Sequence, residues 1–312
     1  LERQLTLATD AESLITLNLR LGEIQLAKLE QAGMAVQTYS RVLEIDAGNE
    51  TATAALETLL DNEEEQLGVA KILEPAYRSN NQWPRLIQAY EIMVAHSENP
   101  EEKLGLLGEI ARLQEITGDE QKAFEALGRG LRVDPAHEET QARLDNLARQ
   151  MGAYAELVAL YEEVIPDIVN DELVIAILFK VAQIQEQVLQ DPEKAAASYE
   201  RVMDIDPTNF DSVDYLIDLH RRNNNYEALV AAVVRKSEMV DNVDDRKSLV
   251  LYAADVREKI MEDPEGAIDL YQQVLAIDDT DATALDALQA LYIQTENWDA
   301  LKDVYRRKAE LA

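Results

Sequence analysis

A short segment recurs along the chain at a fixed spacing, and this restricts the possible folds more than any other feature. Ala123, Ala195 and Ala267 stand at the same position of successive copies, which gives the chain a 72-residue period. Self-similarity with a fixed period predicts a repeat protein whose units pack only on their neighbours. The copies read DEQKAFEALGRGLRVDPAH at 119–137, DPEKAAASYERVMDIDPTN at 191–209 and DPEGAIDLYQQVLAIDDTD at 263–281, and a divergent one reads QAGMAVQTYSRVLEIDAGN at 31–49.

The composition favours helices and limits the partners of the chain. Among its 312 residues only 5% are aromatic, and the 61 acidic residues exceed the 29 lysines and arginines, which gives a formal net charge of −32. A field of this sign repels nucleic acid and anionic membranes, whereas it suits solubility, a basic partner or a salty environment. No apolar run approaches the ~18 residues of a membrane span. We therefore expect no nucleic-acid partner and no membrane insertion.

The sequence contains no recognisable catalytic or metal site. It has no cysteine, and its three histidines, His96, His137 and His220, lie far apart in the chain. Phosphate-binding glycine loops and nucleophile motifs are also missing. Asp278 and Asp281 resemble part of a calcium loop but lack the required glycine and glutamate, so an interhelix turn is expected. We predict a protein that is not an enzyme and needs no metal or cofactor.

Helix start and stop signals recur with the repeat. Thr9 or Asp10 can cap a long helix through about residue 29, whose leucines and isoleucines indicate burial on more than one side. Asn-Pro at 99–100 and Asp-Pro at 191–192 and 263–264 predict helix starts, and Asp-Pro at 134–135 and 206–207 predicts helix ends. These signals together indicate about 17 helices and no strand.

One part of the chain departs from the period. Trp83 follows Ala35 at a longer interval than the one that separates each later repeat alanine from its matching aromatic residue, as in Ala195 and Tyr226. The inserted segment predicts one more helix and turn, and Pro75 predicts a kink or break in that helix. We therefore divide the array at the end of this irregular region, into 1–82 and 83–312, within one continuous solenoid.

The repeat resembles the tetratricopeptide repeat, a 34-residue helix–turn–helix with an A-x3-F…P pattern in its second helix. Ala195, Tyr199 and Pro207 match all three positions. The preceding copy has Leu127 in place of the aromatic residue, and the following copy has Asp279 in place of the proline. The resemblance covers nearly the whole chain and is closest to long acidic bacterial arrays. It implies an all-α, right-handed superhelix of hairpins. A related helical array, the half-a-tetratricopeptide type of RNA-processing scaffolds, is the alternative.

Regular hairpins, which begin near Leu104, Ala176 and Ser248, alternate with a divergent type that begins near Glu138, Phe210 and Ala282. In the divergent type a leucine replaces the small residue, which implies looser helix contact. Its second helix opens with an aromatic residue, and the regular recurrence of this residue predicts core packing. These aromatic residues are Trp83, Tyr154, Tyr226 and Trp298, and the leucines are Leu86, Leu157, Leu229 and Leu301.

The resemblance implies a non-catalytic scaffold that binds a peptide or partner protein in a concave groove lined by the first helix of each hairpin. The chaperone-tail carboxylate clamp of some members is not expected, because Ile184 is apolar where the clamp needs a polar residue. Arginine in such a groove suits carboxylates, which it binds with two parallel bonds. The groove positions of the family correspond to Arg112, Asn146, Arg149, Gln150, Lys180, Arg221, Arg222, Tyr252 and Lys259.

Two other functions are consistent with the sequence. The chain could be a structural spacer or self-assembling array, or the regulatory domain of a larger enzyme. It begins without methionine and begins and ends inside helical patterns. We therefore expect a fragment of a longer array that is monomeric or associates through its ends, with the cytoplasm as the favoured compartment.

Overall fold

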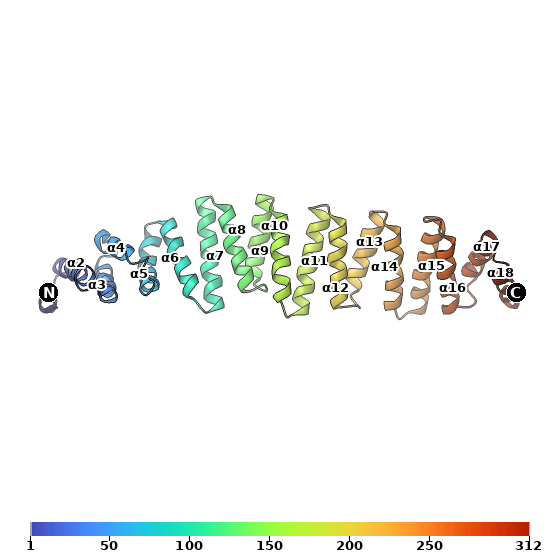
Figure 1. The fold of residues 1–312 in the computed structure, drawn as a ribbon, viewed down its shortest axis with the longest axis horizontal. Coiled ribbons are helices and arrows are strands. Elements are labelled where there is room, and N and C mark those ends of the chain that lie inside the picture. The colour runs from blue at the N-terminus through green and yellow to red at the C-terminus, as the bar shows by residue number, and fades with distance from the viewer. Residues whose placement is uncertain (1, 312) are drawn as a thin grey trace. The chain divides into compact units, whose positions relative to one another are not determined.

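The computed structural model describes residues 2–311, and every regular element among them is a helix (Figure 1). There are 18 α-helices and one short 3₁₀ helix in this range, and all of the α-helices except the first have at least two turns, close to the number that the start and stop signals predict. The α-helices are α1 (Glu2–Leu5), α2 (Ala11–Ala27), α3 (Ala32–Ile45), α4 (Glu50–Glu57), α5 (Gln66–Ser79), α6 (Trp83–His96), α7 (Pro100–Thr117), α8 (Glu120–Val133), α9 (Glu138–Met151), α10 (Tyr154–Val164), α11 (Asp171–Gln187), α12 (Pro192–Ile205), α13 (Phe210–Arg222), α14 (Tyr226–Met239), α15 (Val243–Lys259), α16 (Pro264–Ile277), α17 (Ala282–Gln294) and α18 (Trp298–Leu311), with the 3₁₀ helix η1 (Ile165–Asp167) after α10.

The helices form two compact units, Leu1–Leu160 and Tyr161–Ala312. Within each unit, helices that follow one another in the chain pack together as hairpins. The predicted division after residue 82 concerned the regularity of the repeat and stays a prediction. In the first unit the hairpins are α2–α3, α5–α6 and α7–α8, and in the second they are α11–α12, α13–α14, α15–α16 and α17–α18.

Each hairpin turn contains one residue in the left-handed region. Gly118 and Gly152 have φ values of 81° and 70°, and the other turns have an asparagine, glutamine or glutamate there with φ between 51° and 56°. In every case this residue stands two positions before the second helix of the hairpin. A left-handed residue reverses the chain at little cost for glycine and asparagine and at some cost for others. The common turn keeps the two helices of each hairpin in the same register.

The predicted helix caps are confirmed. The Asp191 and Asp263 side chains accept hydrogen bonds from the backbone N–H groups of Lys194 and Gly266, which begins α12 and α16. Asp206 ends α12 in an extended conformation, as expected for a residue that precedes proline. These signals set the boundaries of the hairpins before any tertiary contact forms.

The repeated small residue lies at the centre of each hairpin. Ala35, Ala123, Ala195 and Ala267 have no exposed surface. A larger side chain here would separate the second helix from the first, because buried cores leave few voids. The residue four positions later is also buried, and it is Tyr39, Leu127, Tyr199 or Tyr271. The core assignment of the regular hairpins is therefore confirmed.

The predicted core role of the aromatic residues that open the divergent second helices is wrong for Trp298, whereas Tyr226 packs against the edge of the core of the second unit. Trp298 is 56% exposed, and Trp83, Tyr154 and Tyr226 are only half-buried. Each is the first residue of its helix, so its side chain lies at the end of the hairpin rather than between the helices. The leucine three residues later is buried instead, and the divergent hairpins α13–α14 and α17–α18 pack less extensively than α11–α12 and α15–α16.

The expected burial of the apolar residues of α2 is also wrong. Its buried residues are Asn18, Gly22 and Gln25, whereas its leucines and isoleucines are half-buried. Tyr39 of α3 lies so close that a Cβ atom on Gly22 would be 2.7 Å from the ring. The face of α2 that packs closest to α3 is therefore the one without a bulky side chain. Across this contact the Thr38 hydroxyl donates to Gln25 Oε1 at 2.8 Å.

Pro75 does not break its helix, and the kink that was predicted as the alternative stays a prediction. α5 runs through it from Gln66 to Ser79, with Pro75 on the exposed side and Leu73 and Tyr77 buried on the other. Burial of that face holds the helix together despite the lost backbone hydrogen bond. The extra helix itself is confirmed. However, α5 forms the regular hairpin with α6, so the short helix α4 is the additional element.

Candidate functional site

Six of the nine predicted groove residues lie on first helices of the hairpins given above, and the other three lie on α9. Eight of the nine are exposed, and Lys180 is half-buried beside Tyr161, whose hydroxyl lies 3.1 Å from Lys180 Nζ. Arg112 is on α7, Asn146, Arg149 and Gln150 are on α9, Lys180 is on α11, Arg221 and Arg222 are on α13, and Tyr252 and Lys259 are on α15.

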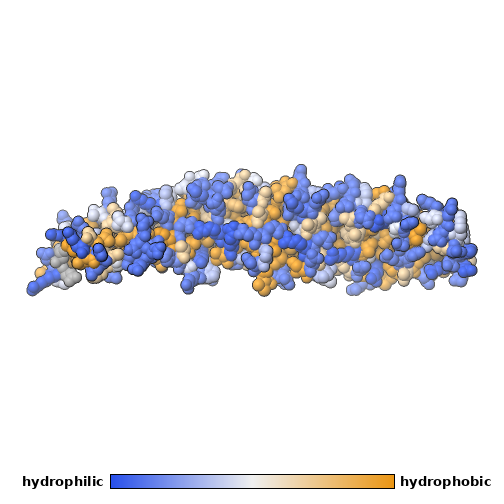
Figure 2. Space-filling model, viewed as in Figure 1, coloured by the Kyte–Doolittle hydropathy of each residue, from blue (hydrophilic) through white to orange (hydrophobic). Residues whose placement is uncertain are grey.

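Most of the groove cations already contact a carboxylate. Arg112 pairs with Glu109 at 2.8 Å, and the Lys259 ammonium lies 2.7 Å from Asp255. Such exposed pairs contribute about 0–1 kcal/mol each, so a ligand can displace them at small cost. The two arginines of α13 pair likewise, Arg221 with Asp218 at 3.3 Å and Arg222 with Glu186 at 2.6 Å. Hydrophilic residues also dominate the face shown in Figure 2.

In the first unit, polar residues of α5 and α6 form a connected network, and the Arg112–Glu109 pair lies on the next helix, α7. Arg78 donates to the Tyr90 hydroxyl at 2.5 Å and pairs with Glu74, whose carboxylate accepts the Tyr90 proton at 3.0 Å. The hydrogen bond from Arg112 lowers the pKa of Glu109, and burial raises that of Tyr90. Every one of these donors has an acceptor, so the network is complete without a ligand.

Between α7 and α9, two glycines open a hollow of about 700 Å³. Gly105 and Gly108 lie on α7, and no heavy atom lies within 4 Å of a Cβ position built on Gly105. Arg143 of α9 crosses the hollow, where it donates to the Gly108 carbonyl at 3.0 Å and to Glu115 at 2.8 Å. Glutamates line much of the remaining wall. The hollow has room for a side chain, and its arginine and histidine have protein partners.

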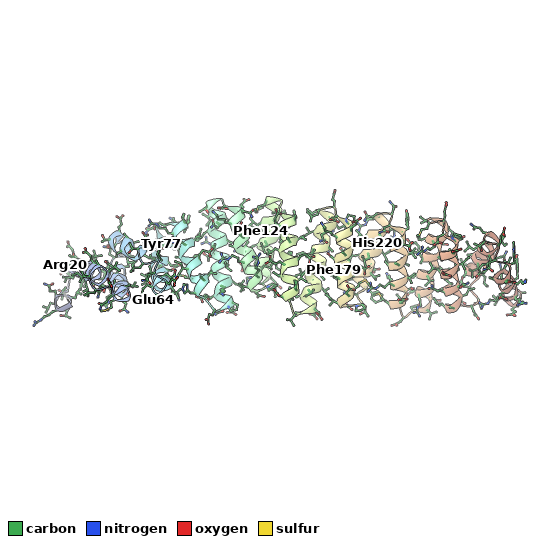
Figure 3. All side chains as sticks on the ribbon, in the orientation of Figure 1. Arg20, Glu64, Tyr77, Phe124, Phe179 and His220 are labelled. Carbon is green, nitrogen blue, oxygen red and sulfur yellow. The ribbon has the colours of Figure 1, made fainter. Side chains whose placement is uncertain are left out.

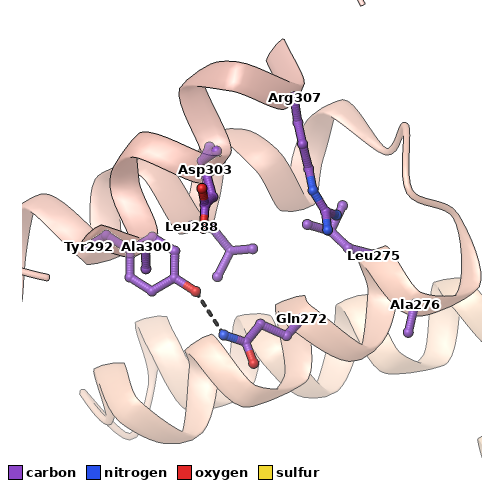
Figure 4. A pocket seen from close by; sticks show the side chains of 9 residues that line it. Gln272, Leu275, Ala276, Leu288, Tyr292, Ala300, Asp303 and Arg307 are labelled. Atoms are coloured by element: carbon purple, nitrogen blue, oxygen red, sulfur yellow. Dashed lines mark hydrogen bonds between the residues drawn. The ribbon is translucent and has the colours of Figure 1, made fainter. Parts of the chain in front are cut away.

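A smaller cavity, of about 400 Å³, lies among α16, α17 and α18 (Figure 4). Leu275, Leu288 and Val304 make its wall apolar, and Gln272 donates to the Tyr292 hydroxyl at 2.8 Å. Its lining has no nucleophile next to a general base, so the chemistry available there is binding alone.

Three aromatic rings of the second unit form a cluster across α11, α12 and α13. The rings of Tyr199 and Tyr215 are stacked, with centroids 5.1 Å apart and planes 3° apart. Phe179 contacts both at 5.7 and 5.9 Å. Tyr215 is 40% exposed, so one ring reaches the surface beside the arginines of α13. Phe179 on α11 and His220 on α13 mark this region in Figure 3.

The hydroxyl of Tyr199 is buried and has no hydrogen-bond partner among residues 2–311. Burial raises the pKa of Tyr199 well above its ordinary value, and the nearby Glu186 raises it further. A buried hydroxyl without a partner costs about 1–3 kcal/mol, so it needs an explanation. We define Phe179, Glu186, Tyr199, Tyr215 and Arg222 as the aromatic–arginine site.

The sequence analysis identified only Arg222 of this site as a groove residue. The missed signal is a departure from the 72-residue period. Tyr215 corresponds to Arg143 and Ala287, and Phe179 corresponds to Leu107 and Leu251. The core alanine, by contrast, is identical at 123, 195 and 267. A set of aromatic residues found in one copy alone could have been recognised as a local specialisation.

The turn that resembles a calcium loop is held by a lysine. Lys247 Nζ lies 2.8 Å from Asp278 and 3.2 Å from Asp281, and Asp281 caps α17. The expected interhelix turn is confirmed. In the range that the structure describes, no three histidine, aspartate or glutamate side chains gather as metal ligands.

This lysine gives a prediction about pH. Its hydrogen bond lowers the pKa of Asp278 from 3.8 to about 2. Because the folded-state pKa is lowered, the stabilisation is complete above the unfolded value and is lost as the pH falls from about 4 to 2. Urea unfolding should show the wild type to be more stable than Lys247→Met at pH 7, with a difference that vanishes near pH 2. A difference that persists at pH 2 would contradict this assignment.

No described helix is both long and apolar enough to cross a membrane.

Comparisons with known proteins agree with the hairpin architecture. The tetratricopeptide repeat profile matches residues 176–209, the hairpin of α11 and α12. No curated protein sequence matches the chain. Similar solved structures include MamA (16% identity, TM-score 0.28), which aligns over 64% of this chain and 93% of its own. The C-terminal part of a tetratricopeptide repeat protein from Cytophaga hutchinsonii is 13% identical with a TM-score of 0.33, and the alignment covers 80% of this chain and 98% of that one. A tetratricopeptide repeat protein from Parabacteroides merdae is 11% identical with a TM-score of 0.26, and the alignment covers 89% of this chain and 98% of that one.

Proposed function

We propose that the chain, whose residues 176–209 match the tetratricopeptide repeat, is a non-catalytic scaffold that binds a peptide or partner protein on the concave face formed by its first helices. Repeat arrays of this family are generally protein-interaction folds. The proposed contact residues are the nine groove residues of the sequence analysis together with the aromatic–arginine site.

The observation that carries this proposal is the contrast between core and first-helix positions. The core alanine is identical at 123, 195 and 267. The matching first-helix position is Gly108, Lys180 and Tyr252 in the same three copies, and it is half-buried in the first two and exposed in the third, so its size, charge and aromatic character all change outside the core. Close packing of the two helices demands a small residue at the alanine position of each copy, whereas recognition of one extended partner demands different residues along its length.

Partner capture from a lysate, read by quantitative mass spectrometry, tests the proposal. We expect a specific partner to be retained by the intact chain and lost with Arg221→Glu/Arg222→Glu, because the double substitution reverses both charges of α13. The matched control is Lys302→Glu/Arg306→Glu on α18. It makes the same change of charge in two exposed pairs of a second helix.

Equal loss in both double variants would show that net charge rather than the first-helix face determines capture. Retention by both would place the contact elsewhere on the chain. Circular dichroism of each variant should first show an unchanged helix content, since all four replaced side chains are exposed.

Self-association is a second candidate function, and α18 supplies the observation that favours it. Trp298 and Tyr305 are both about half exposed on this helix. Exposed aromatic residues close together in one helix are typical of protein contact surfaces. Sedimentation velocity over a concentration series would show association that Trp298→Gln abolishes, whereas a strict monomer would remove this candidate.

A further inference from the structure

The buried hydroxyl of Tyr199 distinguishes it from the other buried tyrosines whose contacts the structure records. Tyr77 donates to Glu57, and Tyr90 to Glu74. Tyr271 occupies the position of Tyr199 in the next copy of the repeat, and its hydroxyl bonds to Asp255 and Glu258 at 2.9 and 2.7 Å. The unpartnered state therefore does not follow from the repeat itself.

Two substitutions in the repeat account for the difference: Gln183 stands where Asp255 stands in the next copy, and Arg222 stands where Gln294 does. Glu186 corresponds to Glu258 and could accept the Tyr199 proton, but it instead contacts Arg222 at 2.6 Å. Arg222 corresponds to Gln294 in the following copy and Gln150 in the preceding one. A glutamine cannot compete for a carboxylate as an arginine does. The arginine thus removes from Tyr199 the glutamate acceptor that its counterpart has.

We propose that the aromatic–arginine site binds a carboxylate of the partner chain by exchange of ion-pair partners, an inference that rests on the proposed function. The incoming carboxylate pairs with Arg222, whose side chain is 61% exposed. Glu186 is released and turns to accept the Tyr199 proton, as Glu258 does with Tyr271. No proton is transferred between residues in this exchange. The bound state keeps one ion pair and gains the hydrogen bond that the free state lacks.

The environment of Glu186 favours a carboxylate over a cation. The Glu186 side chain is only 11% exposed, so an incoming lysine or arginine has little access to it. A cation would also leave the Tyr199 hydroxyl without an acceptor. The net charge of −32 opposes an anion at long range, but at physiological ionic strength such interactions are screened beyond about 8 Å. An aromatic ring next to the carboxylate of the partner chain would cover the exposed face of Tyr215.

Binding of 3-phenylpropionate, followed by NMR of labelled tyrosine rings and arginine Nε–H groups, tests the exchange. We expect shifts at Tyr199, Tyr215 and Arg222 with this probe and none with the neutral 3-phenylpropanamide. A crystal soaked with the acid should show Glu186 within hydrogen-bond distance of the Tyr199 hydroxyl. Equal binding of acid and amide, or a Glu186 that stays on Arg222 in the complex, would overturn the proposal.

Three variants separate exchange from simple charge attraction. Glu186→Gln should bind the acid about tenfold more tightly, because the internal competitor for Arg222 is weakened. Arg222→Gln, which restores the residue of the other copies, should lose binding. Tyr199→Phe should bind more weakly, because displaced Glu186 gains no donor. An affinity that falls in Glu186→Gln would overturn the exchange.

Two blocked dipeptides identify the source of the carboxylate. Acetyl-Phe-Glu-amide offers only a side-chain carboxylate, and acetyl-Gln-Phe offers only a terminal one. Binding of either dipeptide supports the proposed site and shows whether the carboxylate comes from a side chain or from a chain terminus. If neither dipeptide binds, the proposal is overturned. Because these probes need no cellular partner, a failure here leaves the lysate result intact. If the dipeptides bind but the intact chain captures no partner from the lysate, the proposed function is contradicted and the carboxylate site is not.

Discussion

Replacement of Leu229 with alanine is expected to lower the free energy of unfolding of the hairpins around it by about 2–5 kcal/mol. Leu229 is 1% exposed on α14, in the core shared by α11 to α18. Truncation leaves a cavity that neighbouring helices cannot fill, because each layer of a repeat array is buried only by the layers beside it. The loss should therefore be local.

Hydrogen exchange read by mass spectrometry checks both the size and the locality. Amides of α13, α14 and α15 should exchange faster in Leu229→Ala, while those of α2 and α3 keep their wild-type rates. Val169→Ala is the matched control, since Val169 is 96% exposed and its truncation should change little. Faster exchange throughout the described chain would contradict a linear, locally stabilised array.

Removal of the hydroxyl from two equivalent tyrosines is expected to have opposite effects. Tyr271→Phe should destabilise the chain by about 1–3 kcal/mol, because Asp255 and Glu258 lose the donor that both contact. Tyr199→Phe should be neutral or stabilise it by about 1 kcal/mol, because a buried hydroxyl without a partner is removed.

Urea unfolding of the two variants beside the wild type measures this contrast. The substitutions are chemically identical and lie at the same position of successive regular hairpins, so each is the control for the other. Equal destabilisation would show that Tyr199 has a hydrogen-bond partner in solution and would remove the basis for the exchange at Glu186.

The fold could be predicted closely from the sequence because its determinants are local. Caps such as Asp191 and stops such as Asp206 act within a few residues, and the period identifies the equivalent positions. The predictions failed where tertiary contacts decide. The recurrence of Trp298 indicated the core, but recurrence also arises at the exposed end of a hairpin. Pro75 is a strong local signal for a helix break, but burial of Leu73 and Tyr77 keeps α5 continuous through it.

The candidate site was only partly accessible to sequence reasoning. The family's groove positions identified Arg222 but not its partner Glu186, because the pair joins α13 to α11, which belong to different hairpins. The aromatic stack and the unpartnered hydroxyl depend on side-chain directions that no motif specifies. Comparison of each residue with its equivalent in the next copy reduces the number of candidate binding residues. Only the atomic contacts show which hydrogen-bond donor lacks an acceptor.

A hydrogen-exchange footprint of the chain bound to the captured partner tests the central claim most directly. Protection should increase on the first helices of the second unit, α11, α13 and α15, and stay unchanged on the second helices α12, α14 and α16. Protection confined to the second helices, or to α18 alone, would contradict recognition by the first-helix face.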